Sequence, residues 1–340
     1  MHVLVTGGAG FIGSHAVLRL LEDGHRVTVI DNLVRGHAEA ATILASIGGD
    51  RFRFERCDLA ETQRITALLA GVDLVMHFAA LAYVGESVDQ PLRYWRANLA
   101  GTLSLLEAMD AANVARIVFS STCATYGEPP PERVPIDETC PQAPVNPYGH
   151  SKLACERVIR DHAVARRRAG QEFGFAFLRY FNVCGGDPAG RIGEDHRPET
   201  HLIPICLEVA LGQRNALTIF GEDWPTQDGT CVRDYVHVTD LIDAHVQVAA
   251  RLRGDSEHVY NVGTGTGHSV REVLESCRRV TGAPIAAIRG DRRAGDPAVL
   301  VNSPRRIESE LGWRARRREL DTMVEDAWRW RSRHPRGYGA

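Results

Sequence analysis

The glycine cluster near the N-terminus constrains the fold more than any other feature of this sequence. An apolar run over His2–Thr6 leads directly into the pattern G-x-x-G-x-x-G at residues 7–13. Apolar residues then recur at helical spacing up to Gly24, and a second apolar run, Arg26–Asp31, ends in a carboxylate. A strand, a tight turn, a helix and another strand in this order predict a right-handed crossover, and therefore a parallel sheet covered by helices.

Strands and helices continue to alternate after this first crossover. Further apolar runs are FRFERCD, DLVMHFAA, ARIVFSS and FAFLRY, and a long helix is predicted from Tyr148 to about Ala169. The alternation predicts an α/β fold with a Rossmann-type doubly wound parallel sheet. The pattern loosens later, so we expect a dinucleotide-binding domain over 1–181 and a smaller C-terminal α/β substrate-binding lobe over 182–340, with some strands interleaved. The proline-rich segment 127–147 is predicted to be a surface loop.

The glycine turn and the end of the second strand together indicate a dinucleotide site. Glycines let the backbone approach a pyrophosphate, and the helix N-terminus supplies N–H donors and partial positive charge. The Asp31 carboxylate can accept hydrogen bonds from both ribose hydroxyls and repels a 2′-phosphate, which favours NAD over NADP. Nearby Arg35 weakens that preference. Asp58 follows the third strand, where an adenine edge would lie.

A second constellation lies at the start of the long helix. Among the 40 lysine and arginine residues, Lys152 is the only lysine. Tyr148 precedes it by one helical turn, so the two side chains share a face, and a fixed ammonium favours the phenolate form of the tyrosine. An ammonium is also compact enough to bridge two ribose hydroxyls, whereas a guanidinium is larger and planar. Thr122, at the end of the fifth strand, can place a hydroxyl between Tyr148 and a substrate.

Charge and composition exclude several classes of function. The net charge of -3 gives no broad footprint for nucleic acid or an anionic membrane, and the arginine-rich C-terminal segment is interrupted by acidic residues, as on a solvated helix face. No apolar run has the length of a membrane span and no leader pattern precedes the first strand, so we expect a cytoplasmic protein. The eight cysteines, and His196 and His201, lack metal-ligand spacing, and no metal is expected.

The motifs together resemble the UDP-glucose (UDP-galactose) 4-epimerase family of the extended short-chain dehydrogenases/reductases. The resemblance covers nearly the whole chain and includes PYGHSKLACE, LRYFNVCG, GEDHRPETHLIP, TIFGEDWPTQDGTCVRDYVHVTDL and YNVGTG. It implies NAD-dependent 4-epimerisation of a UDP-sugar through a transient 4-keto sugar. Tyr148 would be the base, Lys152 would support its phenolate, Thr122 would assist, and NAD would stay bound between turnovers. It also implies a homodimer formed by the Tyr148 helix and a helix over Leu92–Met109.

The resemblance further assigns residues to each ligand. It implies NAD contacts from Gly7, Gly10, Phe11, Ile12, Gly13, Asp31, Asn32, Asp58, Leu59, Phe78, Ala79, Ala80, Asn98, Tyr148, Lys152 and Tyr180. It implies nucleotide-sugar contacts from Thr122, Tyr148, Asn182, His201, Leu202, Phe220, Arg233, Arg293, Asp296 and Leu300. Two arginines can grip a diphosphate, and an aromatic face can stack on uracil.

Several departures keep alternatives open. Ala82 replaces a lysine that certain family members use toward the cofactor. Leu300 lies where the pocket wall varies, so UDP-GlcNAc/UDP-GalNAc and UDP-xylose/UDP-arabinose remain possible substrates. A nucleotide-sugar 4,6-dehydratase would need an Asp-Glu pair after the threonine, where this chain has Cys123 and Ala124. A non-catalytic NAD-binding module would be expected to lose the tyrosine and lysine that this chain keeps.

Overall fold

The protein divides into two compact units. The computed structural model describes residues 1–293 and 296–339. Unit 1 comprises Met1–Gly127, Gln142–Arg179 and Ile242–Tyr260, and unit 2 comprises Glu128–Pro141, Tyr180–Leu241 and Asn261–Ala340. This division differs in two places from the predicted single boundary at residue 181. Glu128–Pro141, which is part of the proline-rich segment, belongs to unit 2, and Ile242–Tyr260, which holds most of a later helix and the start of a strand, belongs to unit 1.

A seven-stranded sheet forms the centre of unit 1. Its order is β10-β6-β5-β4-β1-β2-β3, and β1 pairs in parallel with both β2 and β4. The chain thus switches direction across the sheet between β1 and β4, as the predicted Rossmann-type fold requires. The strands are β1 His2–Thr6, β2 Arg26–Asp31, β3 Phe52–Arg56, β4 Leu74–His77, β5 Arg116–Thr122, β6 Gly174–Tyr180 and β10 Glu257–Val262.

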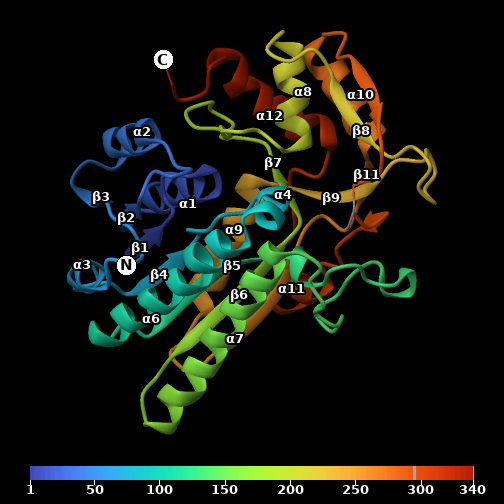
Figure 1. Ribbon diagram of the computed structural model, residues 1–340. Helices are drawn as coiled ribbons and strands as arrows, with labels where there is room; N and C mark the ends of the chain where they lie inside the picture. Colours follow the sequence, from blue (N-terminus) through green and yellow to red (C-terminus); the bar gives the residue numbers. More distant parts are fainter. Residues whose placement is uncertain (294–295, 340) are drawn as a thin grey trace. The chain divides into compact units, whose positions relative to one another are not determined.

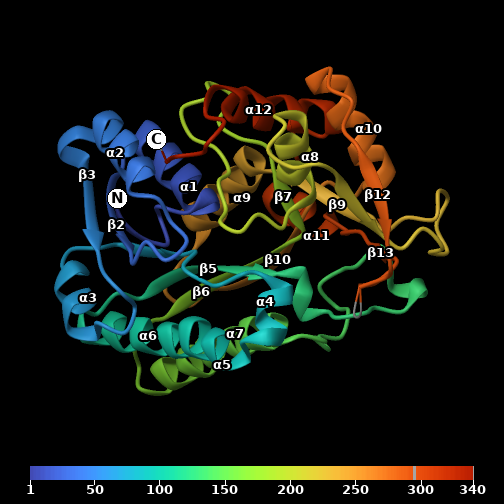
Figure 2. The same ribbon diagram turned by 45° about the horizontal axis from the view of Figure 1, so that its top comes forward.

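Helices cover both faces of this sheet (Figure 2). One face packs its apolar side chains, Phe119 and Phe177 among them, against α3, α6 and α7. On the other face, Arg19 of α1 pairs with Asp243 of α9 at 3.1 Å. The helices are α1 Phe11–Glu22, α2 Ala38–Gly48, α3 Thr62–Leu68, α4 Val84–Asp89, α5 Pro91–Tyr94, α6 Gly101–Ala111, α7 Pro147–Arg168 and α9 Val238–Arg251.

The predicted helix over Leu92–Met109 has an irregularity that the sequence pattern did not indicate. A π-helical turn, Trp95–Ala100, joins α5 to α6. The turn contains Asn98, whose side chain is buried inside unit 1. Single π-helical turns inside α-helices are frequent at functional sites.

Unit 2 combines two small sheets with a layer of helices. Strands β7, β9, β11 and β13 form one sheet, β8 and β12 form the other, and α8, α10 and α12 pack together (Figure 1). A capping box between Ser269 and Glu272 starts α10, and Gly282 ends it in a left-handed conformation. The elements are β7 Asn182–Cys184, α8 Leu202–Ala210, β8 Leu217–Phe220, β9 Val232–His237, β11 Gly267–Ser269, α10 Val270–Thr281, β12 Ala287–Gly290, β13 Val299–Leu300, α11 Arg305–Leu311 and α12 Leu320–Arg333.

The proline-rich segment is only partly a surface loop. Most of it is exposed, but Ile136 is fully buried and bridges to Asn302. The Ile136 N–H donates to Val301 O at 2.8 Å, and Asn261 Nδ2 donates to Ile136 O at 3.0 Å. The prediction of a surface loop is therefore wrong at this residue, because backbone pairing within unit 2 draws it inward.

All eight cysteines are free thiols, and Cys123 alone among them is not buried. Within residues 1–293 and 296–339, every helix is too short or too polar to cross a membrane.

Candidate active site

The glycine turn of unit 1 is shaped by two positions that exclude side chains. Gly7 has φ 68°, and a Cβ there would lie 2.6 Å from Ala79 N. A Cβ on Gly13 would lie 2.1 Å from Gly7 O, which is far inside contact distance. Gly10 is the N-cap of α1, and no side chain caps that N-terminus. The turn therefore directs the start of α1 to the carboxyl ends of β1 and β4, where backbone N–H groups suit a pyrophosphate.

Asp31 ends β2 and retains capacity to accept further hydrogen bonds. Its Oδ2 accepts from Ala9 N at 3.0 Å and its Oδ1 from Leu33 N at 2.8 Å. Burial raises the pKa of Asp31, although these two N–H donors oppose the rise. A Cβ on Gly36 would lie 2.8 Å from the carboxylate, so glycine there keeps space around it. One donor per oxygen leaves lone pairs for two ribose hydroxyls, and the site fits a dinucleotide.

Neighbouring groups define the surroundings of this carboxylate. Asn32 Nδ2 donates to Asp58 Oδ2 at 2.7 Å, which links the end of β2 to the residue that follows β3. Arg35 pairs with Glu86 at 2.6 Å, and its guanidinium carbon lies 4.5 Å from the centre of the Tyr83 ring. Glu86 also pairs with Arg93 at 2.8 Å, so it offsets only part of the charge of Arg35, the residue that weakens the predicted preference for NAD over NADP.

The predicted cofactor residues that follow β4 are fixed by hydroxyl and amide groups. Ala79 N donates to Thr6 Oγ1 at 3.2 Å. The Asn98 amide accepts from Leu81 N at 2.8 Å and donates to Leu81 O at 3.0 Å and to Ser151 Oγ at 2.9 Å. These three bonds give Asn98 a role in holding the segment after β4 against α7. Phe78 and Ala80 also follow β4, and the ring of Phe78 lies 5.0 Å from that of His245. Leu59 follows β3 instead, and a Cβ on Gly101 would lie 3.0 Å from its side chain.

Tyr148 and Lys152 occupy the first two turns of α7. Asn146 caps this helix by accepting from Gly149 N at 2.9 Å, so the tyrosine sits where the helix begins. Lys152 is 2% exposed, and its Nζ lies 4.1 Å from the centre of the Phe119 ring. Burial lowers the pKa of Lys152 to about 8, although Cys155 and Glu156 oppose this. A cation held in an apolar wall is available to a nearby anion or to ribose hydroxyls.

Thr122 lies at the carboxyl end of β5 and is nearly buried, at 7% exposed. Its Oγ1 accepts from Ala124 N at 3.1 Å, which fixes the side chain at the start of a short 3₁₀ turn. This bond uses a lone pair of the oxygen and leaves the hydroxyl proton for another acceptor. The hydroxyl can therefore donate to a substrate oxygen.

A buried network behind this site was not identified from the sequence. Glu156 accepts from Ser121 Oγ at 2.5 Å and from Arg179 at 2.6 and 2.8 Å, and Arg179 also donates to the Tyr126 hydroxyl at 2.9 Å. The network ties the end of β5 to α7 and β6, and so supports Lys152 one turn away. The sequence carried one signal of this network: Glu156 follows Lys152 by four residues, so the two side chains lie on the same face of the predicted helix.

In unit 2 the structure brings five of the predicted substrate residues together. The Arg293 guanidinium carbon lies 4.7 Å from the centre of the Phe220 ring, and Arg293 Nε lies 2.9 Å from Asp296 Oδ2. Arg233 Nη2 lies 3.8 Å from Asp296 Oδ1, and Arg233 is opposite Leu300 in the β9–β13 pair. Two guanidinium groups beside an aromatic face can bind a diphosphate and a base.

The remaining predicted residues of unit 2 lie at other places. Asn182 is on β7, opposite Tyr235 of β9. Tyr180 ends β6 and is 9% exposed. His201 precedes Leu202, the first residue of α8, and its ring joins a group of two carboxylates and a second imidazole.

Similarity to known proteins agrees with this geometry. A model described as the NAD dependent epimerase/dehydratase family matches residues 3–263. The chain belongs to this family. The match spans the glycine turn, Asp31 and the tyrosine-lysine pair, so the resemblance expected from the sequence is confirmed at the family level.

Individual members of the epimerase/dehydratase family extend the match to the whole chain. A UDP-glucose 4-epimerase of Halalkalibacterium halodurans is 49% identical over 341 residues, covering 99% of this chain and 98% of that protein. A probable UDP-arabinose 4-epimerase of Oryza sativa subsp. japonica is 46% identical, covering 100% of this chain and 84% of that protein. A crystal structure of UDP-glucose-4-epimerase from Stenotrophomonas maltophila, with bound NAD and formylated UDP-arabinopyranose, matches with a TM-score of 0.92 and 39% identity, covering 99% of both chains.

Proposed function

We propose that the protein is an NAD-dependent UDP-glucose/UDP-galactose 4-epimerase. The observation that carries the proposal is the buried ammonium of Lys152 one helical turn after Tyr148, in the same unit as the Asp31 dinucleotide turn. Burial of an unneutralised cation is costly, so its presence here points to a task in chemistry. The UDP-glucose 4-epimerase with 49% identity over nearly the full length supports the same reaction.

Unit 1 would hold NAD through groups that the fold prepares in advance. The start of α1 would bind the pyrophosphate, Asp31 would accept from the adenosine ribose, and Lys152 would donate to the nicotinamide ribose. NAD held by these groups would supply the hydride transfer that oxidises and then reduces the sugar C4. Because such a cycle gives no net oxidation, NAD would not need to be exchanged between turnovers.

Tyr148 and Thr122 would manage the proton of the sugar 4-hydroxyl. The Tyr148 phenolate, favoured by the Lys152 ammonium, takes this proton as C4 is oxidised and gives it back when the 4-hydroxyl forms again. Thr122, held by its bond from Ala124 N, donates to the same oxygen. The 4-keto sugar must turn over between the two steps, so contacts with the sugar ring need to be weaker than those with the diphosphate.

Unit 2 would bind the UDP part of the substrate through Arg233, Arg293 and Phe220. A second candidate, 4-epimerisation of UDP-xylose/UDP-arabinose, is favoured by the 46% identity to the Oryza sativa relative. Leu300 opposes Arg233 on the neighbouring strand and would form the wall that meets the sugar. A pentose is smaller than glucose and an N-acetylhexosamine is larger, so the relative rates with these two sugars would show how much space the Leu300 wall leaves for the substrate.

We further propose that the enzyme forms a homodimer and that it works in the cytoplasm. Helices α4 to α7 of unit 1 carry apolar side chains that are between 39% and 69% exposed, namely Val84, Val88, Leu92, Leu103 and Val164. Burying such a surface against a second copy would be favourable. Eight unpaired thiols are in keeping with a reducing compartment.

The test is a parallel assay of three substrates without added NAD. Purified protein is incubated with UDP-galactose, UDP-GalNAc and UDP-xylose, and the 4-epimers are quantified by chromatography. Formation of UDP-glucose as the fastest reaction is expected, and faster formation of UDP-arabinose would favour the second candidate. Absence of all three products from NAD-loaded, folded protein would reject 4-epimerisation of these sugars.

A further inference from the structure

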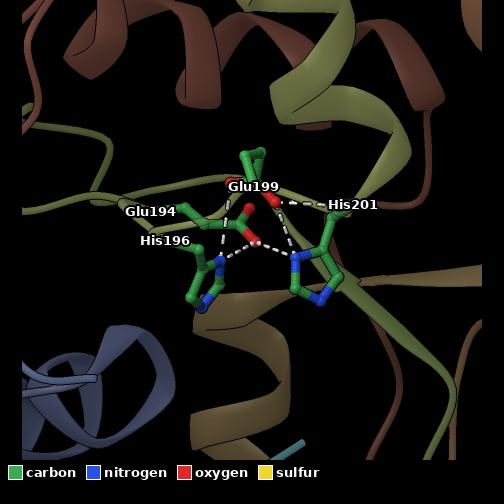
Figure 3. A group of neighbouring side chains, drawn as sticks. All are labelled: Glu194, His196, Glu199 and His201. Carbon is green, nitrogen blue, oxygen red and sulfur yellow. Dashed lines mark hydrogen bonds and ion pairs between the residues drawn. The ribbon is translucent and has the colours of Figure 1, made fainter. Parts of the chain in front are cut away.

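Two histidines and two glutamates converge in the loop that connects β7 to α8. Figure 3 shows both imidazole rings turned toward the two carboxylates, Glu194 and Glu199. One ligand atom from each of Glu194, His196, Glu199 and His201 lies within 4.8 Å of the other three. All four residues belong to unit 2. The spacing of the two histidines predicts no metal site, and the family resemblance implies a nucleotide-sugar contact for His201.

The distances between these atoms suit a single metal ion. His196 Nδ1 lies 3.2 Å from Glu194 Oε1 and 3.5 Å from Glu199 Oε2. His201 Nδ1 lies 2.9 Å from Glu199 Oε1 and 3.5 Å from Glu194 Oε1. Ligands about 2.1 Å from a tetrahedral Zn²⁺ are separated by about 3.4 Å, so small movements would place an ion at equal reach of all four.

The type of donor also selects among metals. Two imidazole nitrogens and two carboxylate oxygens suit Zn²⁺ and similar divalent transition ions, whereas Mg²⁺ and Ca²⁺ prefer oxygen ligands alone. The carboxylates are almost covered, with side-chain exposures of 6% for Glu194 and 4% for Glu199, while His201 is 42% exposed. The ion would thus have an entry path along the His201 side.

The loop around the four residues is held in place by other contacts. Arg191 makes a two-point ion pair with Asp187, at 2.7 and 2.9 Å. The Tyr338 N–H donates to Asp195 Oδ2 at 3.0 Å. A Cβ on Gly193 would lie 2.3 Å from the Trp330 ring, so the loop backbone packs directly on α12. A loop fixed at both sides of the cluster presents its ligands with little loss of entropy on binding.

We propose that Glu194, His196, Glu199 and His201 bind one divalent transition-metal ion of the Zn²⁺ type in a structural site. Four protein ligands fill a tetrahedral shell, which is typical of structural rather than catalytic zinc. The ion would fasten the last part of the β7–α8 loop, from Glu194 to His201 at the N-cap of α8. This proposal does not depend on the epimerase activity, and its test reads metal binding and thermal stability.

The test is Zn²⁺ titration of the full-length protein after removal of metal with a chelator. Calorimetry is expected to give one Zn²⁺ per chain, and thermal unfolding is expected at a higher temperature with Zn²⁺ than with chelator. The double variant His196→Asn and His201→Asn removes two ligands and should weaken Zn²⁺ affinity by more than roughly 100-fold. That is beyond the roughly 10- to 100-fold loss typical when residues that hydrogen-bond to metal ligands are changed. His150→Asn combined with His258→Asn, which changes two histidines outside the cluster, should bind like the wild type.

A second variant guards against a folding defect. Glu199→Gln keeps the size and most hydrogen bonds of the side chain but removes one charge, and it should weaken Zn²⁺ by at least tenfold while circular dichroism stays unchanged. Co²⁺ bound to the wild type should show the intense visible absorption of a tetrahedral complex. Equal Zn²⁺ affinity in wild type and Glu199→Gln, or no binding by folded wild type, would overturn the proposal and leave an ion-paired cluster.

Discussion

The candidate binding regions of the two units differ in how they hold their charges. In unit 1 the key groups are buried, with Lys152 only 2% and Asp31 only 8% exposed. In unit 2 the corresponding groups lie near solvent, with 58% of the Arg293 side chain and 39% of Phe220 exposed. Arg233 is the exception in unit 2, with only 14% of its side chain exposed. A buried, pre-positioned site suits a cofactor that stays bound, whereas a site with Arg293 and Phe220 open to solvent suits a substrate that must enter and leave in each turnover.

Two buried carboxylates show that burial alone does not mark a ligand site. Asp234 of unit 2 accepts from Thr264 N, Thr264 Oγ1, Gly265 N and Asn302 N, at 2.8 to 3.1 Å, and burial still raises its pKa to about 6. Within the described part of the chain, the donors to Asp31 are two N–H groups, those of Ala9 and Leu33. Asp234 is therefore occupied in joining strands and loops of unit 2, while Asp31 keeps acceptor capacity for a ribose.

The largest expected effect is loss of the base in unit 1. Tyr148→Phe should lower kcat by roughly 10³- to 10⁴-fold, the upper range for general acid–base catalysis, while NAD remains bound. Steady-state kinetics and the NAD content of the purified variant check this. The matched control is Tyr94→Phe, whose ring lies 6.4 Å from Tyr148; it should lose stability through its bond to Glu86 but keep activity. A Tyr148→Phe enzyme of normal speed would contradict the assigned role.

The second largest expected effect is on the free energy of unfolding, because burying the Lys152 ammonium destabilises the folded protein. Because burial lowers the pKa of Lys152 from 10.5 to about 8, the unfolded chain binds more protons than the folded chain between these pH values. The cost is thus complete below pH 8 and disappears as pH rises to 10.5. Lys152→Met should raise the free energy of unfolding of NAD-free protein by about 3 kcal/mol at pH 7, and by little at pH 10.5.

Urea unfolding at several pH values measures this difference between variant and wild type. Leu153→Met, at the neighbouring buried position, is the control and should give a difference that is small and independent of pH. A constant advantage of Lys152→Met across the range would mean that the ammonium is not destabilised by its surroundings, and that the contrast between the units is smaller than the structure indicates.

Substitutions in unit 2 should affect substrate affinity more than chemistry. Arg293→Gln removes one guanidinium from the candidate diphosphate site and is expected to raise KM by roughly 10- to 100-fold with little change in kcat. Arg292→Gln is the matched control, because Arg292 stacks on Trp224 at 4.1 Å and pairs with Asp223 instead. An equal loss of kcat and kcat/KM in Arg293→Gln would indicate a role in the transition state.

The smallest expected effect is on the choice of sugar. Leu300→Tyr should lower kcat/KM for UDP-GalNAc about tenfold more than for UDP-galactose, since a larger wall excludes the N-acetyl group first. Competition between the two substrates in one reaction measures the ratio directly. An unchanged ratio would remove Leu300 from the sugar-binding wall.

The sequence predicted the regular part of the protein well, for physical reasons. The bounds predicted for the first two strands, His2–Thr6 and Arg26–Asp31, match the structure, because Gly7 follows the first strand and Gly24 and Asp31 mark the two ends of the second. The long helix was predicted within one residue at each end, since Pro147 can only begin a helix and its apolar period is continuous. The structure places Tyr148 and Lys152 one helical turn apart on this helix, as their spacing predicts, while their catalytic role stays a prediction.

Contacts between distant residues could not be predicted in this way. The pairing of Arg35 with Glu86, the bonds of Asn98 to Leu81, and the burial of Ile136 all depend on how the backbone returns on itself. The same limit explains why His196 and His201 were given no common role. Their separation in sequence matches no helical or hairpin ligand pattern, and only the loop conformation brings their rings to the same carboxylates.

Inversion of the sugar C4 by this protein is expected to proceed by oxidation and reduction of the same carbon while NAD stays bound. UDP-galactose carrying deuterium at C4 tests this when it is incubated in ordinary water with the protein as purified and no added NAD. The expected product is UDP-glucose that retains the deuterium at C4, as read by mass spectrometry and NMR. UDP-glucose with hydrogen from water at C4, or a strict need for added NAD in each turnover, would contradict it.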